Sequence, residues 1–368
     1  MTALLTHGAT MLLTYATHSL LACVLALIAA RSLHAPQERD MLWKVALVAP
    51  LVTTLVAIVA PGLRGTPFRV ELADLVRRSP LLQLPDPRLI VRVLDDGIRR
   101  EEFRRLIDPV TTMLSVLAVS VTGLCSAVAG VRLVTRRRIL ARALRARHHV
   151  AGIRDGVRLS SSDTLQSPVA LFPREICLPT FVLRDFSAQH CDTLVAHESA
   201  HLRRRDPSWF ALVDVICACS AYQPLVFVVA RSFRCDVELI CDEAAVRATG
   251  SRTALIGALA LLASPFDAIS PLHGAPAAYN GSPLVARATR IARLSLDERP
   301  AGLRNAMFAA CVLAAALVVA PVVSTVPRID PVPADLSRMT SRARSEGRLV
   351  TVDSTVTEGR MSVRVLVH

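Results

Sequence analysis

The organisation of this chain follows from residues 193–206, which read TLVAHESAHLRRRD. His197 and His201 stand four residues apart, so a helix would project both imidazoles from one face, one turn apart. That spacing can hold a single metal ion, and Glu198 can take a proton from a water molecule at the metal. The alternative is a surface helix that carries these residues by accident. With 10 His and 11 Glu in 368 residues, chance would give the full His-Glu-x-x-His pattern ~0.008 times in the chain, which favours the metal site.

A third metal ligand is available further along the chain. Residues 234–246 predict a helix on which Glu238 and Asp242 lie one turn apart. Alone, this acidic pair is equally typical of a solvated helix face. After an HExxH stretch, two histidines and Glu238 would leave the fourth position of Zn²⁺ open, as in catalytic zinc sites. Asp242 could then accept the outer N–H of a ligand histidine and fix its tautomer.

These residues and a few others carry a resemblance to a known family. The further matching runs are Ile176-Cys177-Leu178-Pro179, Arg205-Asp206, Gln223-Pro224-Leu225-Val226 and Cys241-Asp242. With the HExxH stretch, they make residues 110–325 resemble the membrane zinc peptidases of the BlaR/MecR beta-lactam-sensing transducers, and more distantly the HtpX and CAAX-prenyl endopeptidases. The resemblance implies that His197, His201 and Glu238 bind zinc and that Glu198 is the general base. It also implies signalling by cleavage of the protein itself or of a cytosolic repressor.

Composition indicates a membrane protein. The chain is 52% hydrophobic and its mean hydropathy is +0.44, which is too apolar for an ordinary soluble domain. A net charge of +13 could suggest nucleic-acid binding, but the arginines are spread through loops without a recognisable nucleic-acid module. We therefore expect no direct nucleic-acid contact and attribute the charge to loops that flank membrane helices. The nine cysteines form no CxxC pair, so we expect reduced thiols.

Four long runs without charged residues predict four transmembrane helices. They lie within residues 1–30, 45–63, 109–131 and 305–327. Basic residues after the first and third runs place those ends in the cytoplasm by the positive-inside rule. Both termini are therefore expected outside the cytoplasmic membrane, which the resemblance makes a bacterial inner membrane. No run contains Asp, Glu, Lys or Arg to mark an ion path, which disfavours a channel or transporter.

The segments between the predicted spans differ in character. Residues 64–108 are expected to form an extracytoplasmic amphipathic loop, with a surface-lying helix near residues 98–107. Residues 328–368 are expected to form a short extracytoplasmic tail, in which strands on either side of residues 357–359 make a hairpin. This tail is too short for the penicillin-binding domain of the antibiotic-sensing transducers.

Residues 132–304 are expected to form a cytoplasmic, zincin-like (gluzincin) α+β domain between the third and fourth spans. We predict an edge strand within residues 165–183, along which an extended substrate could bind. The HExxH helix should begin after Ser187, its N-cap. The other expected elements are two helices within residues 209–230 that meet at a proline, a packed helix at 253–266 and a loop at 268–284.

The favoured function is that of an integral membrane zinc metalloendopeptidase, mainly α-helical, that acts in signalling at the cytoplasmic membrane face. Its partners would be the lipid bilayer and a peptide or protein substrate such as a repressor. The alternative is a receptor-like scaffold with a structural zinc site. The residue that stabilises the oxyanion is left open among Tyr222, His273 and Tyr279.

Overall fold

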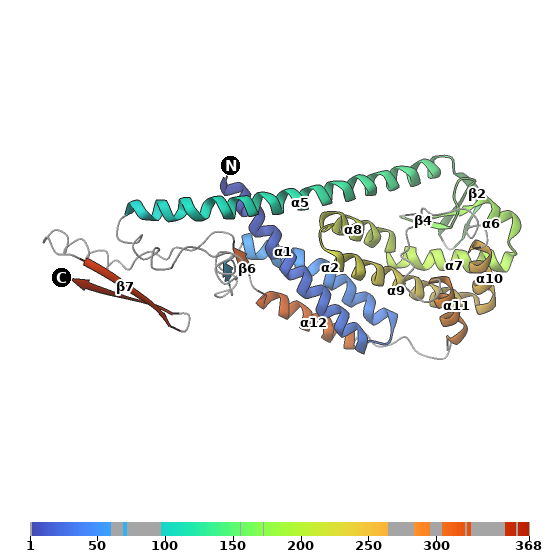
Figure 1. The fold of residues 1–368 in the computed structure, drawn as a ribbon. Coiled ribbons are helices and arrows are strands. Elements are labelled where there is room, and N and C mark those ends of the chain that lie inside the picture. The colour runs from blue at the N-terminus through green and yellow to red at the C-terminus, as the bar shows by residue number, and fades with distance from the viewer. Residues whose placement is uncertain are drawn as a thin grey trace. The chain divides into compact units, whose positions relative to one another are not determined.

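Helices make up most of the fold (Figure 1). The structure, a computed structural model, describes residues 2–59, 69–71, 97–154, 156–171, 173–263, 283–294, 304–320, 322–324, 350–357 and 360–367. The α-helices are α1 (Thr2–Ala29), α2 (Pro36–Val59), α5 (Gly97–Arg145), α6 (Thr180–Asp185), α7 (Ala188–Arg204), α8 (Asp206–Cys219), α9 (Pro224–Thr249), α10 (Arg252–Ala263), α11 (Pro283–Arg293) and α12 (Arg304–Val319). The strands are β1 (Arg69–Glu71), β2 (His148–Arg154), β3 (Val157–Ser162), β4 (Val169–Leu171), β5 (Glu175–Pro179), β6 (Val322–Ser324), β7 (Val350–Thr357) and β8 (Arg360–Val367).

The chain separates into two compact units. One comprises residues 1–17, 56–121 and 319–368, and the other residues 18–55 and 122–318. In the first unit, β7 pairs with β8 in antiparallel register, which confirms the strands of the predicted hairpin. A parallel pairing of β1 with β6 was not expected from the sequence. The predicted peptidase region, residues 132–304, falls within the second unit.

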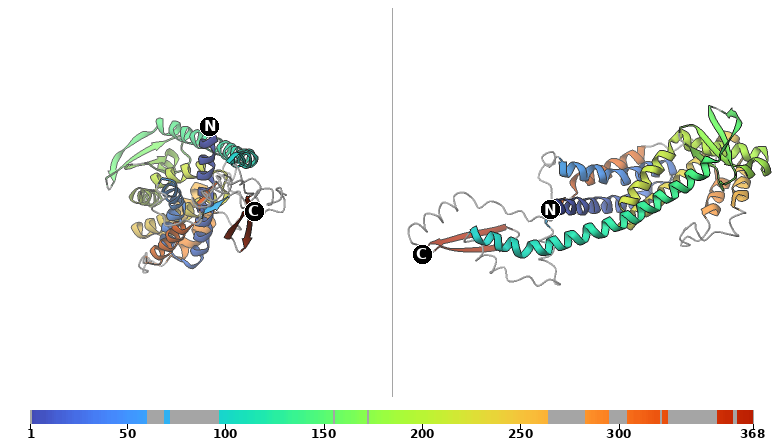
Figure 2. Two further views of the ribbon diagram at one scale, coloured as in Figure 1. Left: turned by 90° about the vertical axis from the view of Figure 1, so that its left-hand side faces the viewer. Right: turned by 90° about the horizontal axis from the view of Figure 1, so that it is seen from above.

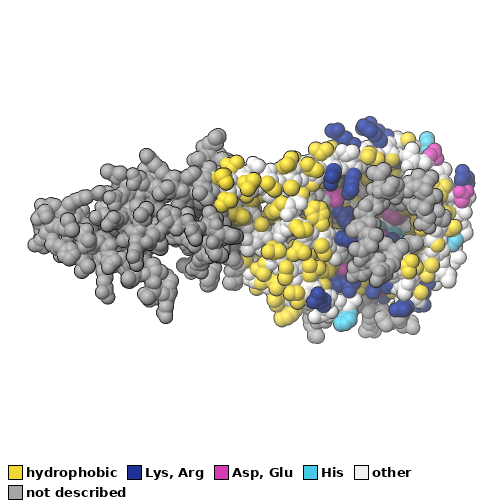
Figure 3. Space-filling view, viewed as in Figure 1, with side chains coloured by type: hydrophobic (Ala, Val, Ile, Leu, Met, Phe, Trp, Pro, Cys, Tyr) yellow, Lys and Arg dark blue, Asp and Glu magenta, His cyan; other side chains and the backbone are white. Residues whose placement is uncertain are grey.

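Three segments of the described chain are long and apolar enough to cross a membrane. They are Gly8–Ser32, Pro36–Ala57 and Met113–Arg145, and they overlap the first three predicted spans. Helix α12 has 16 residues, fewer than the roughly 20 that a crossing needs, so the fourth span stays a prediction. Apolar side chains gather on the face shown in Figure 3, and Leu124 of α5 and Phe308 of α12 are 68% and 73% exposed. Such exposure is expected of a surface that lipid covers.

Two helices extend beyond their predicted boundaries. Helix α5 begins at Gly97 and continues through Pro109, so the helix predicted near residues 98–107 is the first part of α5 and not a separate surface element. A proline is tolerated in such a helix where local adjustments satisfy the freed carbonyl. The rest of the predicted 64–108 loop, apart from β1, lies outside the described residues.

Helix α2 also begins early, at Pro36, because proline suits the first helical position. Its first turns carry Arg39, Asp40 and Lys44, which all form ion pairs. These partners explain how charged residues can lie in a packed helix next to an apolar run.

A helical core joins α1, α2, α8, α9 and α12, of which α1, α2 and α12 run side by side in Figures 1 and 2. Its buried members include Ala22, Cys23, Leu42, Trp43, Ala46, Val213, Ile216, Val226, Phe233, Leu313 and Leu317. The two helices predicted within residues 209–230 are present, since α8 ends at Cys219 and α9 begins at Pro224. Pro224 can begin a helix because the first amide of a helix has no intrahelical partner.

A four-stranded sheet in the order β2-β3-β5-β4 packs against α7. Among the strands that the structure describes, β4 pairs only with β5 and is therefore an edge, as predicted. Ile176 and Leu178 of β5 pack against Val195 of α7, while α10 buries Leu255 on the other side, as expected of a packed helix. The amide of His190 donates to the Ser187 hydroxyl, which confirms the predicted N-cap. The HExxH helix is thus held between a sheet and other helices.

Candidate metal centre

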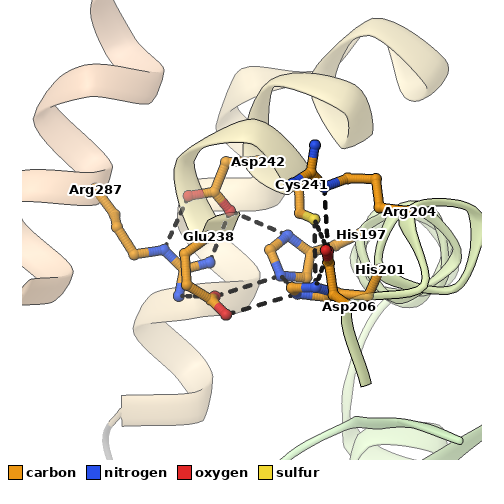
Figure 4. Close-up of polar contacts among 8 residues, drawn as sticks. All are labelled: His197, His201, Arg204, Asp206, Glu238, Cys241, Asp242 and Arg287. Carbon is orange, nitrogen blue, oxygen red and sulfur yellow. Dashed lines mark hydrogen bonds and ion pairs between the residues drawn. The ribbon is translucent and has the colours of Figure 1, made fainter. Parts of the chain in front are cut away.

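Two helices bring the three predicted ligands together (Figure 4). Helix α7 carries His197 and His201, and α9 carries Glu238. The Nε2 atoms of the two histidines lie 3.3 Å apart. Nε2 of His197 lies 3.6 Å from Oε2 of Glu238, and Nε2 of His201 lies 3.6 Å from Oε1 of the same carboxylate. The three side chains therefore face one common point.

These separations fit a zinc ion. Zinc–nitrogen bonds of about 2.0–2.1 Å at tetrahedral angles place neighbouring ligand atoms about 3.3–3.4 Å apart. Two neutral imidazoles that face each other through Nε2 cannot both donate into the same gap, whereas both can give a lone pair to a cation. Two imidazoles and one carboxylate are also a donor set that zinc accepts in catalytic sites. The residues present therefore fit Zn²⁺.

Each candidate ligand histidine has a carboxylate behind it. Nδ1 of His197 lies 3.1 Å from Oδ1 of Asp242, and Nδ1 of His201 lies 2.9 Å from Oδ2 of Asp206. Both aspartates are buried. A carboxylate that accepts the Nδ1–H of a histidine leaves the lone pair of Nε2 directed at the metal. Asp242 is in the position predicted for it, whereas Asp206 had no predicted role.

A left-handed residue explains how Asp206 reaches His201. Arg205 has φ 59° and ψ 30°, and it ends α7 and starts α8 within one residue. This sharp turn brings the first residue of α8 back beside the last turn of α7. The Arg205-Asp206 pair was noticed in the sequence. Its contact with His201 depends on the left-handed turn at Arg205, which the sequence pattern does not reveal.

Arg287 on α11 binds two acidic residues of α9, Glu238 and Asp242. Its Nε and Nη2 lie 2.8 and 2.7 Å from the two carboxylate oxygens of Asp242. Its Nη1 lies 3.0 Å from Oε2 of Glu238. This paired contact with Asp242 is a strong and directional arrangement. From the sequence, Arg287 was assigned only to a basic helix, so its contact with the candidate ligand Glu238 was missed.

The candidate ligands open onto a cleft of about 710 Å³. Glu198 lines this cleft but is only 8% exposed, and the backbone amide of Ala170 on β4 donates a hydrogen bond to its carboxylate. The larger apolar residues that line the cleft are Leu140, Pro168, Val169, Leu171, Leu194, Pro207, Phe210, Leu259 and Leu262. The edge strand, the predicted base and the ligands therefore meet in one space.

Residues 106–287 match the model of a protein family described as BlaR1 peptidase M56. This part of the chain belongs to the M56 peptidase family. The matched segment contains α7, α9 and Arg287, and hence all residues of the candidate metal centre. The match confirms the BlaR/MecR resemblance, and with the apolar helices it makes the chain a membrane protein with an M56 peptidase domain. A search of curated proteins finds no match.

The charges of the M56 centre are strongly coupled. Burial lowers the pKa of His197, but Asp242 and Glu238 outweigh that effect and raise this pKa to about 10. Burial raises the pKa of Glu238, but His197 and Arg287 outweigh it and lower this pKa to about 2. Burial also raises the pKa of Glu198, and there it prevails over the nearby histidines. A metal ion that binds here would thus replace a proton on His197.

A second group of metal-binding residues in the M56 domain fits a cation less well. Cys241 Sγ lies 3.4 Å from Nδ1 of His201 and 3.7 Å from Asp206. However, burial and the charge of Asp206 raise the pKa of the Cys241 thiol, while a metal ligand must be a thiolate. Nδ1 of His201 is also already paired with Asp206. The site at Glu238 is therefore the better candidate.

The predicted oxyanion residues of this peptidase receive no support. Tyr222 lies between α8 and α9 and does not line the cleft. His273 and Tyr279 lie outside the described residues, as does the predicted loop at 268–284 apart from its last two residues.

Proposed function

We propose that this M56 peptidase is a zinc-dependent endopeptidase that cleaves peptide bonds at the cytoplasmic face of a membrane. The observation that most supports this proposal is the convergence of His197, His201 and Glu238 on one point beside Glu198. Zinc in such a site supplies Lewis acidity, which polarises the scissile carbonyl and makes a water molecule easier to deprotonate.

Glu198 is the proposed proton carrier. It accepts a proton from the attacking water and then delivers that proton to the leaving amine. Burial raises the pKa of Glu198, which brings it closer to the pH at which a carboxyl group can both accept and donate. The amide of Ala170 orients the carboxylate from the side of β4. Asp206, Asp242 and Arg287 act as positioning residues for the ligands.

The substrate is proposed to bind as an extended peptide along β4. An edge strand offers unpaired backbone groups to an added strand, and β4 lines the cleft beside Glu198. The apolar walls formed by Leu194, Phe210 and Leu259 would favour apolar side chains in the substrate. Self-cleavage or cleavage of a cytosolic repressor would then make this activity part of transmembrane signalling.

The proposed topology has four spans, with both termini outside and residues 132–304 in the cytoplasm of a bacterial cell. The basic end of α5, which includes Arg132, Arg136 and Arg138, supports a cytoplasmic location for the start of the peptidase domain. The fourth span would include α12.

A scaffold with a structural zinc ion is the less favoured alternative. Structural zinc sites have four protein ligands, whereas this centre offers three and a cleft beside them. A structural zinc site needs no buried glutamate beside its ligands. The position of Glu198 next to the cleft therefore favours the peptidase.

The substitution Glu198→Gln separates the two functions because it removes the base and retains all three ligands. We expect the purified variant to bind zinc as wild type does and to lose about 100-fold to 10,000-fold of its peptide cleavage rate. Comparison of the cytosolic peptides from cells with either protein would reveal the substrate. Asp185→Asn, which removes an exposed carboxylate that pairs with Arg184 and does not line the cleft, is the matched control. Cleavage at the wild-type rate by Glu198→Gln would exclude the proposed mechanism.

A further inference from the structure

The start of α2 is bound to the helix that carries Glu238. Arg39 on α2 forms a paired contact with Asp236, with Nη2–Oδ1 at 2.6 Å and Nε–Oδ2 at 3.0 Å. The indole N–H of Trp43 donates to the same carboxylate at 2.8 Å. Asp236 lies two residues before Glu238 on α9, so these contacts fix α9 close to the candidate ligand.

The same part of α2 is also bound to the helix that carries the histidines. Oδ1 of Asp40 lies 3.0 Å from Nη2 of Arg204, the last residue of α7. Nε of Arg204 lies 3.2 Å from Oδ2 of Asp206, and this oxygen lies 2.9 Å from Nδ1 of His201. An unbroken chain of polar contacts thus leads from α2 to a candidate ligand.

These contacts are shielded from water. The side chains of Asp40, Asp206 and Asp236 are 10%, 0% and 7% exposed. A buried ion pair is strongly destabilised when one partner is removed, because the other charge is left uncompensated. Trp43 also packs in the same buried core as Phe233 of α9. Displacement of α2 would therefore either break these pairs or move α7 and α9 with it.

Catalysis itself does not explain this arrangement. Arg39, Asp40 and Trp43 do not line the cleft and touch none of the three candidate ligands directly. They lie at the start of a helix that is long and apolar enough to cross a membrane. We name these three residues the α2 clamp.

We propose that the α2 clamp positions both ligand-bearing helices, so that a movement of α2 in the membrane changes the zinc affinity of the site. The inference rests on the proposed zinc function. By thermodynamic linkage, a zinc ion that binds the site must also favour one position of α2. The clamp residues are positioning residues and not catalytic ones.

Zinc affinity of the purified full-length protein, measured by competition with a chelator, tests the clamp. Loss of a residue that orients a metal ligand lowers metal affinity about 10-fold to 100-fold. Because the clamp acts through one further residue, we expect Asp40→Asn and Arg39→Gln each to lower zinc affinity by about 3-fold to 10-fold. Asp40→Asn combined with Arg204→Gln should have no more effect than Arg204→Gln alone, since both residues belong to one chain of contacts.

Lys44→Met is the matched control. Lys44 binds the other oxygen of Asp40 at 2.8 Å within α2. Its ammonium also lies 4.9 Å from the ring centroid of Trp209 on α8 and 5.8 Å from that of Phe233 on α9, and methionine retains contact with both rings. The variant should keep wild-type zinc affinity while it loses an ion pair of the same aspartate. Thermal unfolding of each metal-free variant shows whether it is folded before its zinc affinity is compared.

Tryptophan fluorescence gives a second test of the clamp. If the clamp residues only stabilised the fold, zinc binding would not change the emission of Trp43. The chain has two tryptophans, and Trp209→Phe leaves Trp43 as the only emitter. Zinc added to this metal-free variant should change the Trp43 emission, and the same change should occur when Glu198→Gln is also present. It should be absent when His197→Ala removes a ligand.

The outcomes distinguish the clamp from the proposed function. The clamp alone would be overturned by two results together. Folded Asp40→Asn and Arg39→Gln would bind zinc within twofold of the wild-type affinity, and zinc binding would leave the Trp43 emission unchanged. Zinc binding without peptide cleavage would overturn the peptidase and leave the clamp. A wild-type protein that binds no zinc would overturn both.

Discussion

Replacement of Asp206 by asparagine tests the part of the centre that the sequence did not predict. The carboxylate of Asp206 is fully buried, and it accepts from Nδ1 of His201 at 2.9 Å. Asparagine has nearly the same shape and can still accept this hydrogen bond through its amide oxygen. The substitution therefore removes the charge and leaves most of the packing.

The expected effect follows from that lost charge. A hydrogen bond to a charged group is about twice as strong as one between neutral groups, so the amide makes Nε2 of His201 a weaker metal ligand. Residues in this role contribute about 10-fold to 100-fold to metal affinity. Because the hydrogen bond survives in Asp206→Asn, we expect a loss near the lower limit, about 10-fold or 1.4 kcal/mol. Asp206→Ala should approach the upper limit, since it removes the acceptor as well.

Chelator competition on purified protein measures this difference directly. Asp214→Asn is the matched control because Asp214 also lies on α8 and pairs with arginines, but contacts neither candidate ligand histidine. Both variants should retain cooperative unfolding. If Asp206→Asn and Asp206→Ala bind zinc as tightly as Asp214→Asn, then His201 is not held by Asp206 in a metal site, and the reasoning from this contact is refuted.

Three further results are expected. Arg287→Lys should weaken zinc binding about 10-fold by chelator competition, because lysine cannot make the paired contact with Asp242, and unchanged affinity would contradict that role. The metal-free protein should lose stability in thermal unfolding as the pH rises from about 6.5 to about 10, because the raised pKa of His197 stabilises the fold only while this histidine is protonated. Zinc should remove this dependence, and a metal-free protein that gains stability over that range would contradict it. Cys241→Ala should keep one bound zinc ion per chain in elemental analysis, whereas loss of zinc would point to the site at Cys241.

Local pattern was sufficient to predict the helices that carry the candidate ligands. The HExxH spacing fixes two imidazoles on one helix face whatever the rest of the fold does, and Ser187 gives the start of that helix. Glu238 and Asp242 were found because they repeat the same spacing on a second helix. Pro224, at the start of α9, allowed us to predict the turn after which the chain runs back toward α7.

Residues that depend on tertiary packing were not found. Asp206 faces His201 only because Arg205 adopts a left-handed conformation, which arginine rarely does. Arg287 comes from a separate helix, and the Asp40–Arg204 pair joins residues 164 positions apart. No periodic pattern in the sequence reports such contacts. Proline also misled the prediction at Pro109, where α5 continues without a break.

X-ray absorption of the zinc-loaded protein tests most directly whether His197, His201 and Glu238 hold one zinc ion. We predict one zinc per chain, with two imidazole nitrogens at about 2.0–2.1 Å and oxygen as the other neighbours. A sulfur neighbour at about 2.3 Å would place the metal at Cys241 and contradict the claim, as would a protein that retains no zinc.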